Sequence, residues 1–164
     1  DSTAIVGATV GGHVFQVGLW ERPPDDETWR VPIHDVKQAI RDATSSLNCT
    51  MVAFDPYRWQ ATAQELEQEG LPVVEFPTGA VARMVPAWKT FYDAVCDRLL
   101  THDGNPALAR HIENMKLKFD SAGARPVKEH KGSQRHIDLG ICAVGAYHLA
   151  TLPVEVAPEP FLVI

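Results

Sequence analysis

The feature that most constrains the fold is an acidic residue, Asp138, inside the apolar stretch Ile137–Leu149. Read as a helix, this stretch places Asp138 on one stripe with Ile141, Cys142, Gly145 and Leu149. An ionised carboxylate on the buried face of a helix is costly unless a partner compensates its charge, and a metal ion is one such partner. The pattern therefore favours a helix whose acid has a function.

A second acid, Asp55, follows the apolar run Met51–Phe54 and stands directly before Pro56. A strand over this run would deliver Asp55 to the carboxyl edge of a sheet, where open α/β folds build their sites. Two such acids favour a metal-dependent site. Each acid also has a simpler explanation, because Asp-Pro is common in turns and an exposed acid in the first turn of a helix is stabilised by the helix dipole.

Length and composition predict one globular domain. The chain has 164 residues, of which 45% are hydrophobic, enough for an ordinary core. We expect the domain to span residues 1–152 and a tail to follow at 153–164. No run of about 18 apolar residues occurs and the first residues resemble no signal peptide, so we expect a soluble, intracellular protein without a membrane span.

The cysteines are Cys49, Cys96 and Cys142, an odd number without C-x-x-C spacing. This argues against a disulfide framework and against a zinc site. We expect all of them to be small buried residues.

The formal net charge of −6 gives no general attraction to nucleic acid. The segment 116–135 departs from this balance, with a local net charge of +4. Its position before Asp138 favours a phosphate-binding surface, and the simpler alternative is a solvated loop. Its basic residues are Lys116, Lys118, Arg125, Lys128, Lys131 and Arg135.

The first half of the chain alternates strand and helix signals. Two runs rich in Val, Ile and Phe, at 3–10 and 13–20, flank Gly11-Gly12, which predicts a two-residue hairpin turn. Helical periodicity over 36–47 and 59–66 then alternates with short strands at about 50–55 and 73–76. This order predicts a right-handed crossover and a parallel portion of the sheet.

The second half is predicted to be mainly helical. An apolar face of helical spacing runs from Pro86 to Leu99, and Asn105-Pro106 is typical of the start of a helix, here at about 106–117. We expect residues 118–133 to form an extended or hairpin element exposed to a partner. The last helix is expected to begin near Ser133 as its N-cap and to carry Asp138 in its first turns.

Five segments together resemble a known family. In order and spacing they are similar to the C-terminal nuclease domain of tailed-phage terminase large subunits, especially those of actinobacterial phages, and the resemblance covers roughly residues 1–149. It implies a ribonuclease H-like α/β fold, a mixed sheet in which an antiparallel hairpin precedes parallel strands and helices flank both. The segments are Asp1–Gly7, Phe54–Pro56, Val74–Pro77, Arg98–Pro106 and Arg135–Asp138.

The resemblance also implies the site. Asp55 and Asp138 would be the catalytic metal ligands, with Asp1 as an auxiliary acid, for two divalent cations, Mg²⁺ or Mn²⁺. The family carries a first catalytic Asp in a Gly-x-Asp-Gly-Ser-like segment upstream of the position of Asp1, so we expect this chain to lack that strand and its own activity to suffer. Carboxylates suit these cations, and two cations about 4 Å apart activate water and stabilise charge on a phosphodiester.

The implied function is an endonuclease that cuts concatemeric double-stranded viral DNA during genome packaging, in the cytoplasm of the bacterial host. Lys128, Lys131 and Arg135, with Lys116 and Arg83, would hold DNA phosphates. The implied protein partners are the terminase ATPase domain, the portal and the small terminase subunit; the phosphate-binding G-x-x-x-x-G-K-[ST] loop of such an ATPase is absent from the sequence. The alternative is a non-catalytic docking domain of ribonuclease H-like or Rossmann-like shape.

Overall fold

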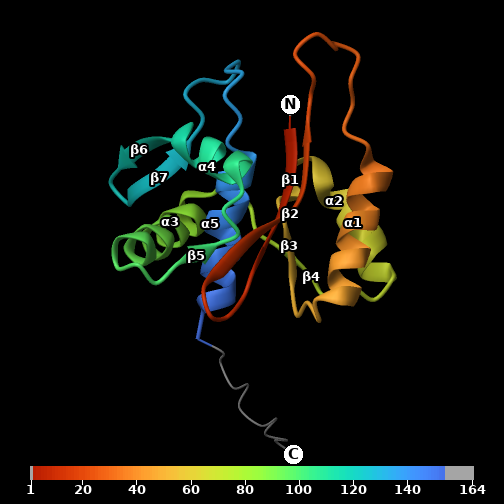
Figure 1. Cartoon of the computed structure of the whole chain (residues 1–164), viewed down its shortest axis with the longest axis horizontal. Helices are drawn as coiled ribbons and strands as arrows, with labels where there is room; N and C mark the ends of the chain where they lie inside the picture. The colour runs from red at the N-terminus through yellow and green to blue at the C-terminus, as the bar shows by residue number, and fades with distance from the viewer. Residues whose placement is uncertain (1, 154–164) are drawn as a thin grey trace, which may run out of the picture.

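The computed structural model describes residues 2–153 and shows a mixed α/β fold. Figure 1 shows β1 to β4 between two groups of helices, with α1 and α2 on one side and α3, α4 and α5 on the other; the hairpin of β6 and β7 lies outside, beside α3 and α4. In chain order the elements are β1 (Ser2–Ala8), β2 (His13–Glu21), α1 (Ile33–Ser46), β3 (Val52–Phe54), α2 (Pro56–Gln68), β4 (Val73–Glu75), α3 (Val81–Cys96), β5 (Thr101–His102), α4 (Pro106–Glu113), β6 (Lys116–Asp120), β7 (Gly123–Val127) and α5 (Asp138–Thr151).

The predicted N-terminal hairpin is confirmed, but its turn is longer than predicted. β1 and β2 are antiparallel with a register running from Ser2 opposite Glu21 to Ala8 opposite Val14. Residues 9–12 connect them, so the turn has four residues rather than two. Gly12 has φ +82°, and a Cβ there would lie 3.0 Å from the Leu99 carbonyl oxygen, which explains the glycine. β5 extends this sheet, parallel to β2.

The parallel portion predicted from the strand and helix order is also confirmed. β3 and β4 pair in parallel, from Val52 opposite Val73 to Phe54 opposite Glu75, as a separately hydrogen-bonded sheet. The helices α1 and α2 accompany these strands and are joined by ion pairs from Lys37 to Glu65, at 2.6 Å, and from Arg41 to Glu69, at 2.7 Å.

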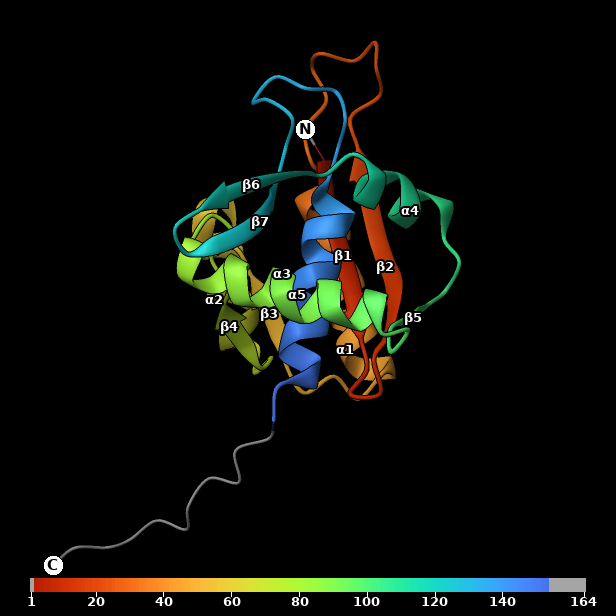
Figure 2. The ribbon, with the colours of Figure 1, turned by 90° about the vertical axis from the view of Figure 1, so that its left-hand side faces the viewer.

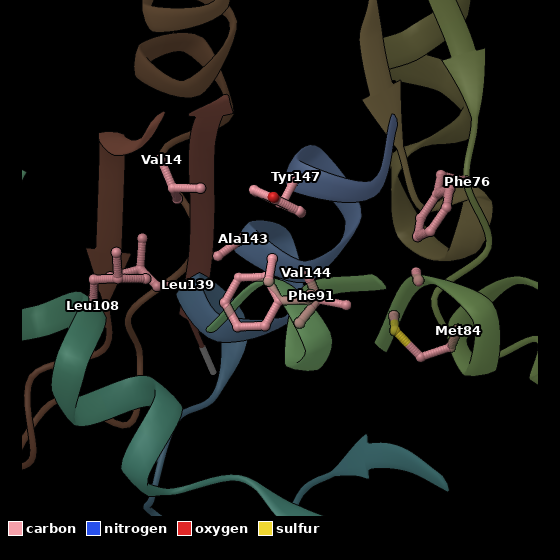
Figure 3. Packing of buried hydrophobic residues seen from close by; sticks show 11 residues of the cluster. Val14, Phe76, Met84, Phe91, Leu108, Leu139, Ala143, Val144 and Tyr147 are labelled. Atoms are coloured by element: carbon pink, nitrogen blue, oxygen red, sulfur yellow. The ribbon is translucent and has the colours of Figure 1, made fainter. Parts of the chain in front are cut away.

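The main core is built around α5. This helix is apolar nearly all round, which suits an element covered on every side. Figure 3 shows α5 with its neighbours, and Phe91 of α3 meets Tyr147 edge-on with ring centroids 5.9 Å apart. The buried cluster consists of Val14, Phe76, Met84, Ala87, Phe91, Ala94, Leu108, Leu139, Ala143, Val144 and Tyr147.

Three predictions for the C-terminal half are wrong in their boundaries. The helix predicted to run to 117 ends at Glu113, because the alternation of Lys116 and Lys118 with apolar residues makes this segment the strand β6. Ser133 does not cap the last helix, since its Oγ accepts a hydrogen bond from the Arg135 amide in a local turn and α5 begins at Asp138. Likewise, α3 begins at Val81 and contains Pro86.

The hairpin expected near 118–133 therefore lies at β6 and β7, which pair in an antiparallel register from Lys116 opposite Val127 to Asp120 opposite Gly123. The prediction that all cysteines are buried is wrong for Cys96, which is exposed, while Cys49 and Cys142 are partly buried. Of the predicted tail, residues 154–164 lie outside the described part of the chain.

Candidate metal site and nucleic-acid surface

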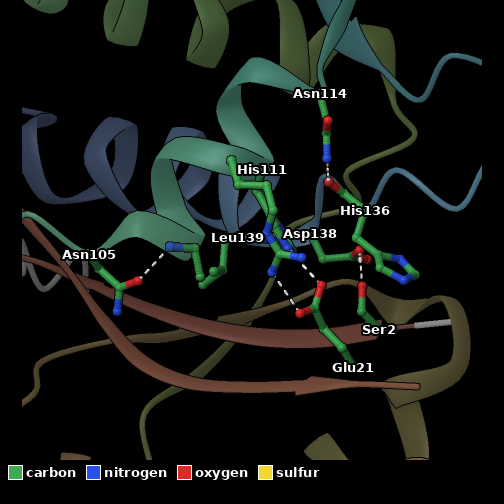
Figure 4. A network of polar contacts seen from close by, with 10 residues as sticks. Ser2, Glu21, Asn105, His111, Asn114, His136, Asp138 and Leu139 are labelled. Atoms are coloured by element: carbon green, nitrogen blue, oxygen red, sulfur yellow. Dashed lines mark hydrogen bonds and ion pairs between the residues drawn. The ribbon is translucent and has the colours of Figure 1, made fainter. Parts of the chain in front are cut away.

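Asp138 is the first residue of α5 and is partly buried. Its Oδ2 accepts a hydrogen bond from the hydroxyl of Ser2, at the start of β1 (Figure 4). The position in the first turn confirms the sequence prediction for the helix. The contact brings together two segments that are far apart in the sequence, at the end of the molecule where β1 begins (Figures 1 and 2).

Asp55 directly follows β3, as predicted, and is also the N-cap of α2. Its Oδ1 accepts a hydrogen bond from the Tyr57 amide at 2.9 Å. Its Oδ2 accepts from the amide of Thr78 at 3.0 Å and from the Thr78 hydroxyl. Thr78 follows β4, the parallel neighbour of β3, so two strand ends fix the orientation of this carboxylate.

Cys142 is a thiol on which the charges of both acids act. It stands one turn after Asp138 in α5, and its Sγ donates to the Ala4 carbonyl at 3.4 Å. Dense surroundings raise the pKa of the Cys142 thiol to about 12, and the charges of Asp138 and then Asp55 add to the rise. Both acids thus affect the same thiol. A separation of under about 8 Å between them remains a prediction.

The donor set suits a hard divalent cation, although it is small. Asp55 and Asp138 offer carboxylate oxygens, and the donors at Ser2 and Thr78 leave lone pairs of both acids unused. Within residues 2–153 no group of three or more His, Cys, Asp and Glu side chains is arranged to hold a metal ion. The predicted auxiliary acid, Asp1, lies outside the described residues.

His136 precedes α5, two residues before Asp138, and is buried. Its Nδ1 has no hydrogen-bond partner among the described residues. Burial lowers its pKa, and the charge of Lys128 lowers it further. Lys128 is therefore close to the segment that leads into Asp138.

The predicted basic residues lie in three places. Lys116 opens β6, while Lys128, Lys131 and Arg135 belong to the loop between β7 and α5, which extends past the start of α5 (Figure 2). Lys116, Lys131 and Arg135 are exposed and Lys128 is partly buried.

Arg83 is separate from this group. It is exposed near the start of α3, and with burial its charge lowers the pKa of His148, ten residues after Asp138 along α5. Arg125 of the basic segment is largely buried and lies 3.9 Å from Asp120. The charge of Lys128 thus acts beside the segment that leads into Asp138, whereas that of Arg83 acts further along α5.

Sequence reasoning missed the residues that hold the acids in place. Ser2 and Thr78 contact Asp138 and Asp55, and His111 contacts the amide next to Asp138. Thr78 could have been found from the sequence, because it carries a hydroxyl and follows β4, the strand next to the one that ends at Asp55.

Phe119 was also not singled out from the sequence. It is 74% exposed and lies on β6 together with Lys116 and Lys118.

Comparisons with known proteins agree on one family. A family model described as the terminase large subunit, endonuclease domain, matches residues 15–152. The chain is 28% identical to the Gene 13 protein of Mycobacterium phage L5 and 29% identical to that of Mycobacterium phage D29, each over 162 residues and 90% of this chain. These alignments cover 27% of each relative, so the chain spans about a quarter of their length.

Two crystal structures share the fold. The large terminase of bacteriophage HK97 matches with a TM-score of 0.61 and 22% identity over 73% of this chain and 25% of that one. The large terminase nuclease of thermophilic phage G20c matches with a TM-score of 0.62 and 13% identity over 90% of this chain and 82% of that one. No helix within residues 2–153 is long and apolar enough to cross a bilayer. By the family match and this fold, the chain belongs to the endonuclease-domain family of phage terminase large subunits, with a ribonuclease H-like architecture.

Proposed function

We propose that this chain is a metal-dependent endonuclease domain that cuts concatemeric double-stranded viral DNA during genome packaging. The observation that carries the proposal is that two carboxylates from different elements, Asp55 after β3 and Asp138 at the start of α5, are each held by a hydroxyl residue from another segment, Thr78 and Ser2. The charges of both acids also raise the pKa of the Cys142 thiol. Membership of the terminase endonuclease family supports the same reaction class.

In this proposal Asp55 and Asp138 hold two divalent cations, Mg²⁺ or Mn²⁺, with Asp1 as a further ligand. When bound, such cations supply an activated water and stabilise charge on the phosphodiester. The chain's own contribution is orientation, since Ser2 fixes the Asp138 carboxylate and Thr78 fixes that of Asp55. Hydrogen bonds to a metal ligand from residues that do not themselves bind the metal orient that ligand and alter the affinity for the metal.

DNA would lie along the loop between β7 and α5. Lys128, Lys131 and Arg135 stand in that loop, close in sequence to Asp138, and Lys116 opens the adjoining hairpin. Such residues contact phosphates, which position a duplex without reading its sequence, so we expect little intrinsic sequence preference. Arg83, which acts on His148 further along α5, belongs to this surface less directly.

The remaining partners follow from the family. We propose that the domain works with a terminase ATPase domain, the portal and the small terminase subunit in the cytoplasm of the bacterial host. A second candidate function, a non-catalytic DNA- or protein-docking domain, is favoured by one observation: the described residues contain no cluster of three or more metal-binding side chains.

A Mn²⁺ titration followed by a plasmid-nicking assay separates the two functions. We expect Mn²⁺-dependent nicking, weak in this chain and stronger in a version extended upstream of Asp1, that is lost in Asp138→Asn of the extended version and retained in Asp97→Asn, a control that removes an exposed acid at the C-cap of α3. A chain that binds DNA but neither binds Mn²⁺ nor nicks in any variant would favour the docking domain.

A further inference from the structure

The last turn of α4 and its C-cap residue contact β2, α5 and the segment before α5 through polar side chains (Figure 4). Arg110 donates from Nη2 to Glu21 Oε2 at 2.7 Å, which ties α4 to the end of β2. Asn114 donates from Nδ2 to the His136 carbonyl at 3.0 Å. His111 joins both sides, with Nε2 3.0 Å from Glu21 Oε1 and Nδ1 3.0 Å from the Leu139 amide.

The contact to Leu139 supplies a helix cap that α5 otherwise lacks. The N-cap residue of α5 is Ile137, which has no side-chain oxygen to accept from the first-turn amides. The Leu139 amide is one of those amides, and it donates to the His111 ring nitrogen. An imidazole from another helix therefore does what Ser, Asp or Asn usually does at this position.

The hydrogen-bond pattern fixes the form of the ring. Because Nδ1 accepts from an amide, the ring proton lies on Nε2 and is donated to the Glu21 carboxylate. His111 is fully buried, with 0% of its surface exposed. Glu21 thus orients a ring that has little freedom to turn.

The backbone spacing between α4 and α5 supports this contact. A Cβ added to Gly140 would lie 3.0 Å from Met115 Sδ and 3.4 Å from the His111 carbonyl oxygen. A side chain at 140 would therefore be tight against Met115, next to the end of α4, so the glycine suits the close approach of this end of α4 to α5.

We propose that His111 is a positioning residue that fixes the first turn of α5 and with it the Asp138 carboxylate. The proposal rests on the proposed function for the role of Asp138. The physical reason is adjacency: Leu139 is the next residue after Asp138, so a fixed Leu139 amide sets the backbone from which the carboxylate projects. Contacts that orient a metal ligand through a second residue typically alter metal affinity by about 10- to 100-fold.

Two substitutions separate the cap from mere packing. His111→Asn keeps an acceptor at the position of Nδ1, whereas His111→Gln keeps an N–H at the position of Nε2 and loses that acceptor. Both remove the ring, so we expect similar losses of global stability in urea. Only His111→Gln should accelerate hydrogen exchange of the Leu139 amide by about tenfold and weaken Mn²⁺ binding by about tenfold. His111→Asn should change each by less than about threefold.

Equal exchange of the Leu139 amide in the two variants would overturn the cap, and a cap effect without a difference in Mn²⁺ affinity would overturn the positioning of Asp138. A wild-type chain that binds no Mn²⁺ would instead overturn the proposed function, while the exchange contrast still decides the role of His111. If neither variant folds, Glu21→Ala and Glu21→Gln replace them. Only Glu21→Ala removes the acceptor that orients the ring, so only it should accelerate exchange at Leu139, and equal exchange in this pair would also contradict the proposal.

Discussion

At the scale of single residues, Asp55 combines two tasks that can be separated by substitution. It caps α2 through the Tyr57 amide, and it acts together with Asp138 on Cys142. Asn is as good an N-cap as Asp but carries no charge, whereas Ala offers no acceptor. The two interpretations of Asp55 from the sequence, a turn residue and a metal ligand, are therefore compatible in one side chain.

We expect Asp55→Asn to abolish metal-dependent nicking and to keep the cap on α2 through its amide oxygen, while losing the acceptor for the Thr78 amide. Asp55→Ala should also abolish nicking and cost about 1 kcal/mol more stability than Asp55→Asn, because the cap is lost as well. Plasmid nicking with Mn²⁺ and urea unfolding of both variants measure the two effects. Retained nicking in Asp55→Asn would remove this residue from the metal site.

A second prediction at the scale of single residues concerns how the stability of the fold at acid pH depends on Glu21. Burial alone would raise its pKa, but hydrogen bonds from Arg110 and His111 outweigh burial and hold the pKa below the ordinary value of 4.5. A carboxylate with a lowered pKa stabilises the fold above its unfolded pKa, and this contribution is lost as pH falls through the lower, folded pKa. Urea unfolding of wild type should therefore weaken below about pH 4.5 more steeply than that of Glu21→Gln. Parallel curves for the two proteins would contradict the assignment.

At the scale of elements, the loop between β7 and α5 differs from the other charged surfaces of the molecule. Lys37 and Arg41 of α1 and Lys89 of α3 are paired, with Glu65, Glu69 and Asp93. For Lys131 and Arg135, which are exposed in the loop, the described residues show no such pair. A DNA phosphate that binds the paired residues of α1 and α3 would have to displace a carboxylate. At Lys131 and Arg135 it would displace only water.

Replacing Lys128, Lys131 and Arg135 together by Ala should weaken binding to unrelated duplexes about equally and lower the salt slope by about three units, one for each phosphate contact. Stability should hardly change, because exposed charges contribute roughly 0 to 1 kcal/mol each. The matched control replaces Lys37, Arg41 and Lys89 by Ala, with the same change of net charge. Equal DNA binding by the two triple variants, measured by fluorescence anisotropy across salt concentrations, would make the loop an ordinary solvated segment.

The elements show what the sequence could predict and why the remainder required the structure. Apolar runs bounded by proline gave β3 and β4, and Asn105-Pro106 gave the start of α4, because these signals are local. The end of α4 was misplaced because the residues that follow it pair across the β6–β7 hairpin, and the start of α5 was misplaced because Ser133 makes a local turn instead of capping it. The cap of α5 comes from His111, 28 residues before Leu139, and no local motif encodes it.

At the scale of the whole molecule, the number of acids around the site limits the activity we expect. The chain supplies Asp55 and Asp138 within its described residues, and the family resemblance predicts a further acid upstream of Asp1. Fewer carboxylates mean weaker binding of hard cations. The sequence predicted where both acids stand, one after a strand and one in the first turns of a helix, but the effect of both charges on Cys142 depends on how β3 and α5 pack in three dimensions.

The chain as it stands should therefore bind Mn²⁺ weakly and nick plasmid poorly, whereas a version extended upstream through the Gly-x-Asp-Gly-Ser-like segment should nick efficiently. Calorimetric Mn²⁺ titration and a nicking time course on both proteins measure the difference. Equal nicking by the two would mean that the required acids are already present in the shorter chain, with Asp1 as the first candidate.

The two acids stand on separately hydrogen-bonded parts of the molecule. Asp55 follows the β3–β4 sheet, while Asp138 begins the helix that packs on the β1–β2–β5 sheet. Among the described residues of β3, α2, β4 and the turn after it, Phe76 alone joins the main buried cluster. A cation shared by both carboxylates would thus act as a cross-link between two bodies held together by few side chains. Its binding would add up to about 2.7 kcal/mol at 100 times the dissociation constant, and it would convert independent opening of the two parts into a single cooperative transition.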